Sequence, residues 1–242
     1  MKKISKDSPL PLYYQIKEAI GDAIENGELS PGELIPPERE ICDFQGVSRM
    51  TVNKAIMALV NEGVLYREQG KGTFVSKPKE KQKLQLEGFT EQMQRKGLKA
   101  SNKLLSFKIK ESNKQIIEIL RLPIKETRVL EINMLRIIED EPYAIETIYI
   151  PYYMCKDITK KTLESKSLYE VFREKYNFNL QFAKQTIEPI VLNEFESNLL
   201  DQGVNALALM FRRTTYLDNG IPIEHTREIY RSDKYKYEIT LT

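Results

Sequence analysis

Residues 36–76 read PPEREICDFQGVSRMTVNKAIMALVNEGVLYREQGKGTFVS. This stretch predicts a short helix, a tight turn through Gln45-Gly46-Val47 and a second helix that begins at Ser48. Gly63 ends the second helix, and two short strands follow, joined by a turn at Gly70-Lys71-Gly72. A helix-turn-helix with a β-ribbon wing is the arrangement that places one helix in the major groove of DNA.

The second helix of this motif has one apolar face and one face that can read bases. Its apolar residues recur at helical intervals, at Val52, Ala55, Ile56, Leu59 and Val60. The opposite face presents Arg49, Asn53 and Lys54, with Thr51 near the helix start. An Arg side chain forks onto the O6 and N7 acceptors of guanine, an Asn side chain pairs with adenine, and each such pair is worth roughly 1–3 kcal/mol of discrimination. We therefore expect this helix to contact base edges.

Two further cations flank the motif. Arg39 on the first helix is placed to reach a phosphate or a base edge, and Lys71 lies between two glycines that let the backbone approach the sugar-phosphate chain or the minor groove. Taken one at a time, such residues are more often ordinary solvated charges. Residues 1–77 hold ten Lys or Arg against eleven Asp or Glu. We therefore expect modest non-specific affinity and a salt dependence set by few phosphate contacts.

The order of these segments resembles a known family. PLYYQIKEAI, LIPPERE, SRMTVNKAI and LVNEGVLYREQGKGTFV, within residues 9–76, are similar to the N-terminal domain of the GntR family of bacterial transcriptional regulators. The resemblance implies a winged helix-turn-helix, mainly α, whose dimer binds a short palindromic operator. It assigns DNA contacts to Arg39, Ser48, Arg49, Thr51, Gly70 and Gly72. Where the family most often has a second Arg on the recognition helix, this chain has Asn53, which predicts a shift of base preference toward adenine.

Composition bounds the rest of the chain. A length of 242 residues suits two domains, and a hydrophobic fraction of 41% is ordinary for a globular protein. No apolar run approaches membrane-spanning length, and the start MKKISKDSPLPLYY lacks the apolar region of a signal peptide. Cys42 and Cys155 have no paired spacing, which favours buried thiols in a reducing cytoplasm over a disulfide or a metal site. We expect a cytoplasmic protein without cofactor, metal or membrane partner.

Three segments follow from these patterns: a DNA-binding domain at 1–76, a linker at 77–83 that reads KPKEKQK, and a second domain at 84–242. In the second domain strands alternate with helices, which predicts an α+β fold with a mostly antiparallel sheet. The expected helices are 90–96, 112–120, 167–175 and 194–201. The expected strands are 103–109, 128–138, 143–150, 181–192, 206–217 and 222–230.

A weak internal echo links two expected hairpins. RIIEDEPYAIE, residues 136–146, and RTTYLDNGIPIE, residues 213–224, both read as strand, acidic turn, Pro and strand, with an early Arg and a late Glu. One interpretation is pseudo-symmetry that places two Arg and two Glu around one cleft. The other is two independent hairpins with common turn residues.

The second domain also resembles a known domain. The segments GFT at 88–90, LRIIEDEPYAIETIYIP at 135–151, KSLYEVF at 166–172 and RRTTYLDNGIPIEHTREIYRSDKY at 212–235 are similar to the UTRA effector domain of the HutC subfamily. This resemblance implies a chorismate-lyase-like fold, dimerisation and a small-molecule effector. The pattern is most similar to that of repressors of N-acetylglucosamine utilisation, whose effectors are amino-sugar phosphates. The expected effector site comprises Phe89, Thr90, Arg136, Glu146, Ser167, Arg213, Glu224 and Tyr230.

The residue types fit an anionic carbohydrate. Thr90 and Ser167 open helices, whose free amides favour anions, although Ser167 with Glu170 also forms a capping box that needs no ligand. Arg136 offers a fork of donors to a phosphate. Glu146 and Glu224 interrupt apolar strands and suit sugar hydroxyls or an amino group. Tyr230 could stack on a sugar ring, although most strand tyrosines are simply packed.

One position departs from the sugar-phosphate regulators. They carry a second Arg two residues before the position of Arg136, and this chain has Met134 there. Arg213 is a candidate to compensate, and a different sugar phosphate or a less charged ligand is the alternative. A sugar phosphate, with an amino-sugar 6-phosphate as the first candidate, is therefore the expected effector.

An enzyme is the competing class, since the implied fold is shared with a lyase. His225 is the single histidine and lies in an apolar strand, where a packing role is more common than a catalytic one. Metal-ligand spacing and a phosphate-binding P-loop are absent from the sequence, and nothing beside Glu146 and Glu224 suggests a leaving-group site. A structural DNA-binding protein would not explain a second domain about twice the size of the first. The sequence therefore favours a regulator without catalytic residues.

Overall fold

The computed structural model describes residues 1–77, 80–83 and 88–238 and divides the chain into two compact units. The first unit holds Met1–Lys81 together with Ser232–Lys236, and the second is built on Gln82–Arg231. Within the segment predicted as a linker, β3 (Glu80–Lys83) pairs with β10 (Tyr235–Glu238), and neither strand was expected from the sequence.

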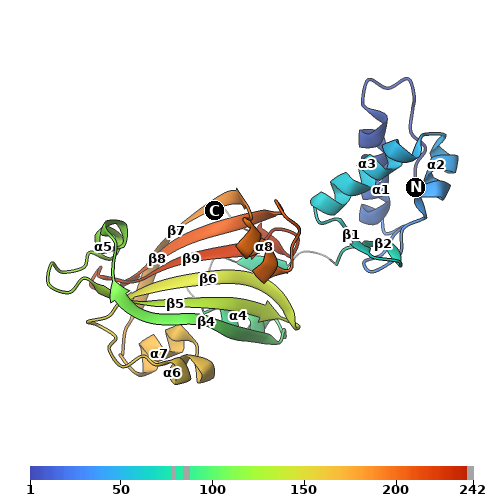
Figure 1. Cartoon of the computed structure of the whole chain (residues 1–242). Helices are drawn as coiled ribbons and strands as arrows, with labels where there is room; N and C mark the ends of the chain where they lie inside the picture. The colour runs from blue at the N-terminus through green and yellow to red at the C-terminus, as the bar shows by residue number, and fades with distance from the viewer. Residues whose placement is uncertain (78–79, 84–87, 239–242) are drawn as a thin grey trace. The chain divides into compact units, whose positions relative to one another are not determined.

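The first unit is the winged helix-turn-helix that the sequence predicts. Its elements are α1 (Leu12–Glu25), α2 (Glu38–Gln45), α3 (Arg49–Asn61), β1 (Leu65–Glu68) and β2 (Gly72–Val75) (Figure 1). Gly46 ends α2 in the left-handed conformation, with φ of 65°, which turns the chain into α3. The apolar faces of the three helices meet in one core with the wing residues Leu65 and Val75. Cys42 belongs to this core and is a free, buried thiol, as predicted.

The wing depends on glycine at one position. Gly72 pairs with Glu68 in the β1–β2 register and has a φ of 129°, which side chains rarely tolerate. A Cβ atom at this position would lie 2.5 Å from the Leu34 side chain. The backbone conformation of the wing turn therefore favours glycine at position 72.

The second unit is a six-stranded antiparallel sheet with strand order β4-β5-β6-β9-β8-β7. The strands are β4 (Ala100–Glu111), β5 (Arg128–Ile138), β6 (Glu141–Pro151), β7 (Leu180–Val191), β8 (Leu207–Leu217) and β9 (Pro222–Arg231). The helices are α4 (Phe89–Arg95), α5 (Lys114–Leu120), α6 (Lys160–Ser165), α7 (Leu168–Glu174) and α8 (Glu194–Leu200). The predicted α+β class and antiparallel sheet are confirmed, and α6 is an additional helix.

Two clusters of buried side chains flank the sheet. Leu168 and Phe172 of α7 pack with Met134 and Ile148 in one cluster, and Leu200 of α8 packs with Leu135, Ile145 and Ile229 in the other. Residues of opposite parity along β5 and β6 point to opposite faces, so α7 and α8 cover different faces of the sheet (Figure 1). Cys155 is a second free, buried thiol, as predicted.

The unit contains an internal repeat of the form strand, helix, strand, strand. The first copy is β4-α5-β5-β6, the second is β7-α8-β8-β9, and the two meet where Thr147 pairs with Arg227. One residue before Thr147, Glu146 pairs with Met134; one residue before Arg227, Thr226 pairs with Arg213. The two hairpins are thus related by this repeat, but the positions matched in the sequence echo are not equivalent in the register, in which Thr226 corresponds to Glu146. The register, however, makes Met134, rather than Arg136, the equivalent of Arg213.

Candidate functional site

The start of α3 is built by a local hydrogen-bond arrangement. Ser48 caps the helix, and its Oγ accepts a hydrogen bond of 3.2 Å from the amide of Thr51. The two hydroxyl groups also lie 2.8 Å apart and bond to each other. Both predicted DNA-contact hydroxyls therefore fix the first turn of the helix, and Arg49 projects from this turn as an exposed side chain.

Asn53 is not free to read a base in this structure. Its amide donates a hydrogen bond of 3.1 Å to Oε1 of Glu38 on α2, and Nη2 of Arg67 on the wing donates to the same oxygen at 2.8 Å. Asn53 is half-buried, and its hydrogen bond to Glu38 ties α3 to α2 and, through Arg67, to the wing. The predicted contact between Asn53 and adenine would require this network to open.

The other predicted cations have weak internal partners. The ammonium of Lys54 lies 4.0 Å from the centre of the Tyr13 ring. Arg39 is largely exposed and lies 4.0 Å from Asp43, while Lys71 pairs with Glu68 at 2.8 Å. Exposed pairs of this kind contribute little stability, so Arg39 and Lys71 can exchange them for phosphate at small cost.

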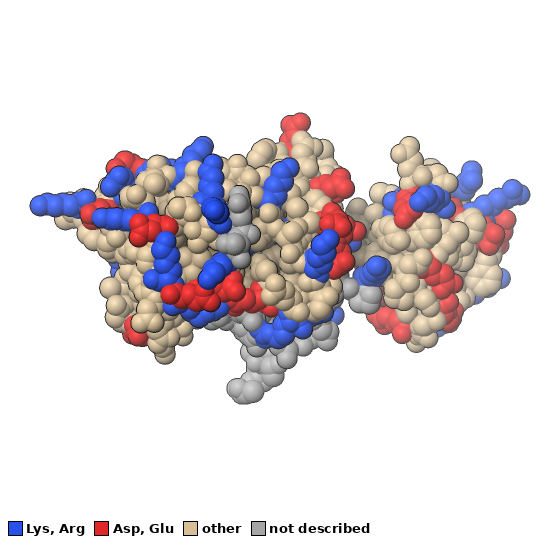
Figure 2. Space-filling model, turned by 90° about the horizontal axis from the view of Figure 1, so that it is seen from below, with Lys and Arg blue, Asp and Glu red and all other residues tan. Residues whose placement is uncertain are grey.

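Charge over the surface is mixed in sign. In the face drawn in Figure 2, Lys and Arg side chains alternate with Asp and Glu, without a broad field of one sign. This agrees with a formal net charge of +2 for the chain. Overall charge therefore gives the chain no strong general attraction to a polyanion.

The second unit contains a cavity, here called the inner cavity, between the sheet and the starts of α4 and α7. Seven of the eight predicted effector residues line it: Phe89, Thr90, Arg136, Glu146, Ser167, Arg213 and Glu224. The eighth, Tyr230, is buried and packs edge-on against Tyr143 and Phe211, with ring centres 6.1 and 5.2 Å apart. An outer cavity of about 590 Å³ adjoins and shares Thr90, Met134 and Ser167 with the inner one.

Arg136 is held from three sides. Its guanidinium forms a close ion pair with Glu146, donates a hydrogen bond of 2.7 Å to Oδ1 of Asn102, and lies 5.2 Å from the Phe89 ring centre. The Nε atom is buried and has no hydrogen-bond partner among the described residues. An unpaired buried donor is costly, so the guanidinium retains unmet demand for an acceptor from a ligand.

Arg213 occupies the other side of the inner cavity and lies between two carboxyl groups. Its Nη2 donates to Oε1 of Glu228 at 3.3 Å, and its Nε lies 3.9 Å from Oε1 of Glu224. Glu224 also accepts hydrogen bonds from Tyr169 at 2.9 Å and from Thr215 at 3.1 Å. Oε1 of Glu224 therefore accepts two hydrogen bonds, one from Tyr169 of α7 and one from Thr215 of β8, and lies near the Arg213 cation, which is also on β8.

Acid exceeds base in this buried cluster. Arg136 and Arg213 face Glu146, Glu224 and Glu228, and none of the five is more than 8% exposed except the half-buried Arg213. Glu146 and Glu228 are direct partners in the β6–β9 register. Burial and the neighbouring Glu146 charge raise the pKa of Glu228 to about 7, against the attraction of Arg213 and Arg136. Burial likewise raises the pKa of Glu224. The cluster therefore holds a proton near neutral pH.

Replacing Glu228 by Gln should remove a pH dependence of stability. Because the folded pKa of about 7 lies above the ordinary 4.5, the stabilisation is full below pH 4.5 and is lost as the pH rises to 7. Urea unfolding of both proteins between pH 5 and pH 8 measures this difference. Wild type should lose about 3 kcal/mol relative to E228Q over that range. Parallel curves for the two proteins would mean that Glu228 does not titrate in this window.

The starts of α4 and α7 lie against each other at the cavity wall. Helix α4 begins at Phe89 with Gly88 as its cap, so Thr90, which was predicted to open the helix, lies in the first turn one residue after its start. A Cβ on Gly88 would lie 3.5 Å from Oγ of Ser167. Ser167 caps α7 in the capping box with Glu170 and donates a hydrogen bond of 3.2 Å to Glu91. The capping role anticipated for Ser167 is thus present.

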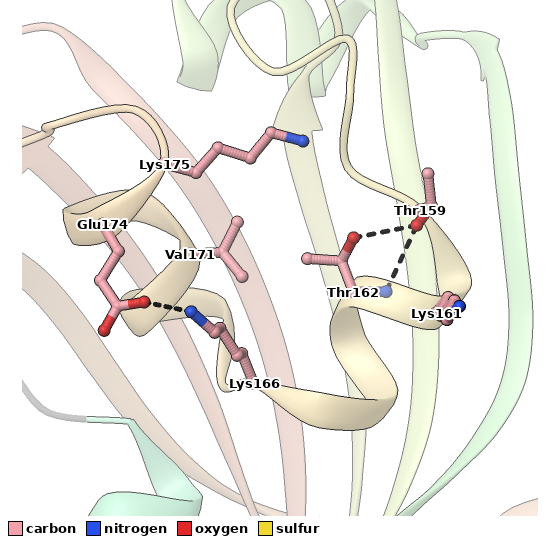
Figure 3. A pocket seen from close by; sticks show the side chains of 7 residues that line it. All are labelled: Thr159, Lys161, Thr162, Lys166, Val171, Glu174 and Lys175. Carbon is pink, nitrogen blue, oxygen red and sulfur yellow. Dashed lines mark hydrogen bonds and ion pairs between the residues drawn. The ribbon is translucent and has the colours of Figure 1, made fainter.

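Lys166 lines both cavities and a third hollow beside them. In Figure 3 its ammonium points to Glu174, with which it forms an ion pair between side chains that are 51% and 57% exposed. Lys175, which lines only the third hollow, donates a hydrogen bond of 2.8 Å to the carbonyl oxygen of Asp157. Among the cations of the inner cavity, Lys166 is thus the one whose partner is an exposed carboxylate.

Four polar residues in or next to the inner cavity were not predicted. Asn102, Lys166 and Tyr169 line the cavity, and Glu228 bonds to Arg213. Glu228 lies in phase with Glu224 along EHTRE, residues 224–228, and this parity was the available signal for a shared face. Asn102 is recognisable only from the β4–β5 register, in which it pairs with Arg136. The other two depend on how α6 and α7 meet the sheet.

His225, the remaining candidate for catalysis, has a structural role among the described residues. His225 bonds through Nδ1 to the hydroxyl of Thr214 at 2.9 Å and stacks on Tyr149. Burial lowers its pKa. Among residues 1–77, 80–83 and 88–238, no three His, Cys, Asp or Glu side chains gather closely enough to hold a metal ion. In the same residues, no helix combines the length and apolarity needed to cross a bilayer.

Comparison with known proteins gives consistent results for both units. Residues 12–75 match the gntR family of bacterial regulatory proteins, and residues 95–236 match the UTRA domain. The chain is 39% identical over 235 residues to the HTH-type transcriptional repressor NagR of Bacillus subtilis (strain 168), covering 97% of this chain and 96% of that protein. It is 28% identical over 230 residues to the mannosyl-D-glycerate transport/metabolism system repressor MngR of Escherichia coli (strain K12), covering 95% of each. The crystal structure of PhnF from Mycobacterium smegmatis superposes with a TM-score of 0.65 at 21% identity, covering 94% of this chain and 99% of that one, which shows a shared fold.

Proposed function

The chain belongs to the GntR family of bacterial transcriptional regulators, in the HutC subfamily with a UTRA domain, and from this we propose a homodimeric repressor that an anionic carbohydrate releases from a palindromic operator. Family members bind operator DNA through the N-terminal domain and an effector through the UTRA domain. We take a sugar phosphate as the effector, with an amino-sugar 6-phosphate first. The name of the relative MngR refers to mannosyl-D-glycerate, which is also an anionic carbohydrate derivative.

The inner cavity is the observation that supports a carbohydrate effector most. It brings guanidinium groups, carboxyl groups and hydroxyl groups together in a buried site, and such groups bind sugar hydroxyls and an anion by oriented hydrogen bonds. The adjoining outer cavity of about 590 Å³ provides room for a ligand of sugar size. In this proposal, Arg136 and Lys166 attract the anionic group, while Glu146 and Glu224 accept hydrogen bonds from the sugar.

Helix α4 is the element proposed to carry the response. Its first residue, Phe89, lies against the Arg136 guanidinium, so a ligand that moves Arg136 must also move Phe89. Two DNA-binding domains of a dimer must fit half-sites about 34–36 Å apart. A ligand that favours one placement of these domains by a few kcal/mol is sufficient to control operator occupancy.

A non-phosphorylated effector is the second candidate. Three buried carboxyl groups against two guanidinium groups disfavour a dianion, and Met134 stands where a second Arg was expected. A neutral or cationic sugar derivative would fit that charge balance better. A phosphate or a cationic sugar should bind more weakly as salt rises, whereas a neutral sugar should not, so the response to ionic strength separates a charged effector from a neutral one.

Fluorescence anisotropy of the full chain on DNA from its own promoter tests the proposal. Glucosamine 6-phosphate, N-acetylglucosamine 6-phosphate and glucosamine serve as the three probes. Release by either phosphate and not by glucosamine supports the sugar-phosphate effector. Release by glucosamine alone supports the second candidate. Binding that none of the three alters, at concentrations up to 10 mM or so, would exclude amino sugars as effectors.

Lys166→Met should weaken the binding of a phosphorylated probe about tenfold, because it removes one charge-assisted contact to the anion. Lys175→Met is the matched control, since Lys175 lines the third hollow and neither cavity. Calorimetric titration with the phosphate that releases DNA measures both. Lys166 is preferable to Arg136 for this test because removal of Arg136 would leave Glu146 buried without its cation. Equal affinities for K166M and K175M would contradict a role of Lys166 in anion binding.

A further inference from the structure

The outward side of α3 has fewer free side chains than its sequence suggests. Asn53 is bonded to Glu38, and Lys54 lies over the Tyr13 ring. In the first turn, Ser48 and Thr51 bond to each other. The residues left to project from the start of the helix are Arg49 and its neighbour Met50, both exposed.

Met50 is the most exposed large apolar residue described in the first unit. Its exposed fraction is 84%, against 37% for Met57, which lies about two turns further along the same helix. A single exposed apolar side chain is common on protein surfaces and needs no explanation by itself. Here, however, it lies next to the Arg expected to read guanine, on the helix that enters the major groove.

The major groove contains one apolar group that such a side chain can recognise. The C5-methyl group of thymine projects into the groove, and apolar side chains contact it. The N-terminal residues of a recognition helix are those that reach base edges. Met is long and flexible, and its thioether packs readily against irregular apolar surfaces. Position, exposure and chemistry therefore all favour a thymine methyl as the partner of Met50.

We propose that Met50 is a specificity-determining residue that packs against the methyl group of a thymine beside the base pair contacted by Arg49. Operator reading then depends on two neighbouring side chains, one polar and one apolar, while Asn53 keeps α3 attached to α2 and the wing. The inference rests on the DNA-binding function of the family and is independent of the effector. It predicts a guanine and a thymine at adjacent or nearly adjacent positions of each half-site.

Deoxyuridine substitution tests this contact, because it removes the methyl group and leaves the base pair intact. Operator duplexes in which each thymine pair of the two half-sites is replaced symmetrically are titrated with the full chain. One buried methyl group corresponds to roughly a fourfold change in affinity, so loss of two should weaken wild type roughly fifteenfold at one position. Met50→Ala should bind the thymine operator more weakly and lose nothing further at that position.

Two variants exclude an indirect effect. Met57→Ala should retain wild-type affinity and the full deoxyuridine penalty, while Met50→Leu should retain at least half of the penalty, since Leu is also apolar and long. A Met50→Ala protein that still discriminates thymine from deoxyuridine at every position as wild type does would overturn the proposal. Wild type that lacks specific binding to its promoter DNA would instead contradict the DNA-binding function and this inference with it. These two failures are distinguishable in the first titration.

Discussion

Arg49→Ala is expected to abolish specific operator binding while leaving the weak binding to unrelated DNA. Arg49 is exposed in the first turn of α3, on a helix whose start is fixed by Ser48 and Thr51. A forked contact between Arg and guanine is worth roughly 1–3 kcal/mol, and a dimer makes it twice. The ratio of specific to non-specific affinity should therefore fall by about thirtyfold to twenty-thousandfold.

Arg39→Ala provides the contrast. Arg39 is exposed on α2 and is expected to contact phosphate, so its loss should weaken specific and non-specific binding alike. It should also reduce the salt dependence by roughly one phosphate contact per subunit. Anisotropy titrations of both variants on operator and scrambled duplexes at several salt concentrations separate the two effects. Unchanged discrimination in Arg49→Ala would refute the assignment of guanine reading to this residue.

Local rules were sufficient to predict most elements of the fold. Ser48 begins α3, Gly46 ends α2, and the alternating strands of the second domain lie within a few residues of their predicted bounds. These features depend on caps, turns and periodicity, which act over a few residues. Helix α6 was not predicted, although Thr159 caps it, and strands β3 and β10 form by pairing segments that are more than 150 residues apart.

The functional residues were less predictable where a distant partner decides their state. Asn53 looks like a base reader in the sequence, but Glu38, 15 residues away, holds its amide. Glu228 lies in a strand that reads as ordinary, and only the β6–β9 register places it opposite Glu146. The predicted cavity residues came together because the family resemblance already contained that long-range information. The residue types alone indicated which polar side chains were candidates for the site, but they did not identify the residues that these side chains contact.

Arg213→Met should be strongly destabilising, because Arg213 is the cation that lies between two buried carboxyl groups. The substitution removes the cation between Glu224 and Glu228 and leaves both carboxyl groups buried. Breaking a buried ion pair on one side costs about 3–5 kcal/mol, because the remaining charge has no compensation. Methionine is chosen because it keeps most of the side-chain length. The loss in unfolding free energy, measured by urea titration at pH 8, is expected in that range.

Two controls check this result: the variant Arg212→Met at the neighbouring position, and the comparison of Arg213→Met at two pH values. Arg212 pairs with Glu188 where the two side chains are 41% and 46% exposed, so Arg212→Met should cost less than about 1 kcal/mol. Protonation of Glu228 removes much of the uncompensated charge, so Arg213→Met should cost less at pH 5 than at pH 8. For the same reason, the double variant R213M/E228Q should recover part of the loss. A cost that is the same at both pH values, and the same with and without Glu228, would show that Arg213 stabilises by packing rather than by charge.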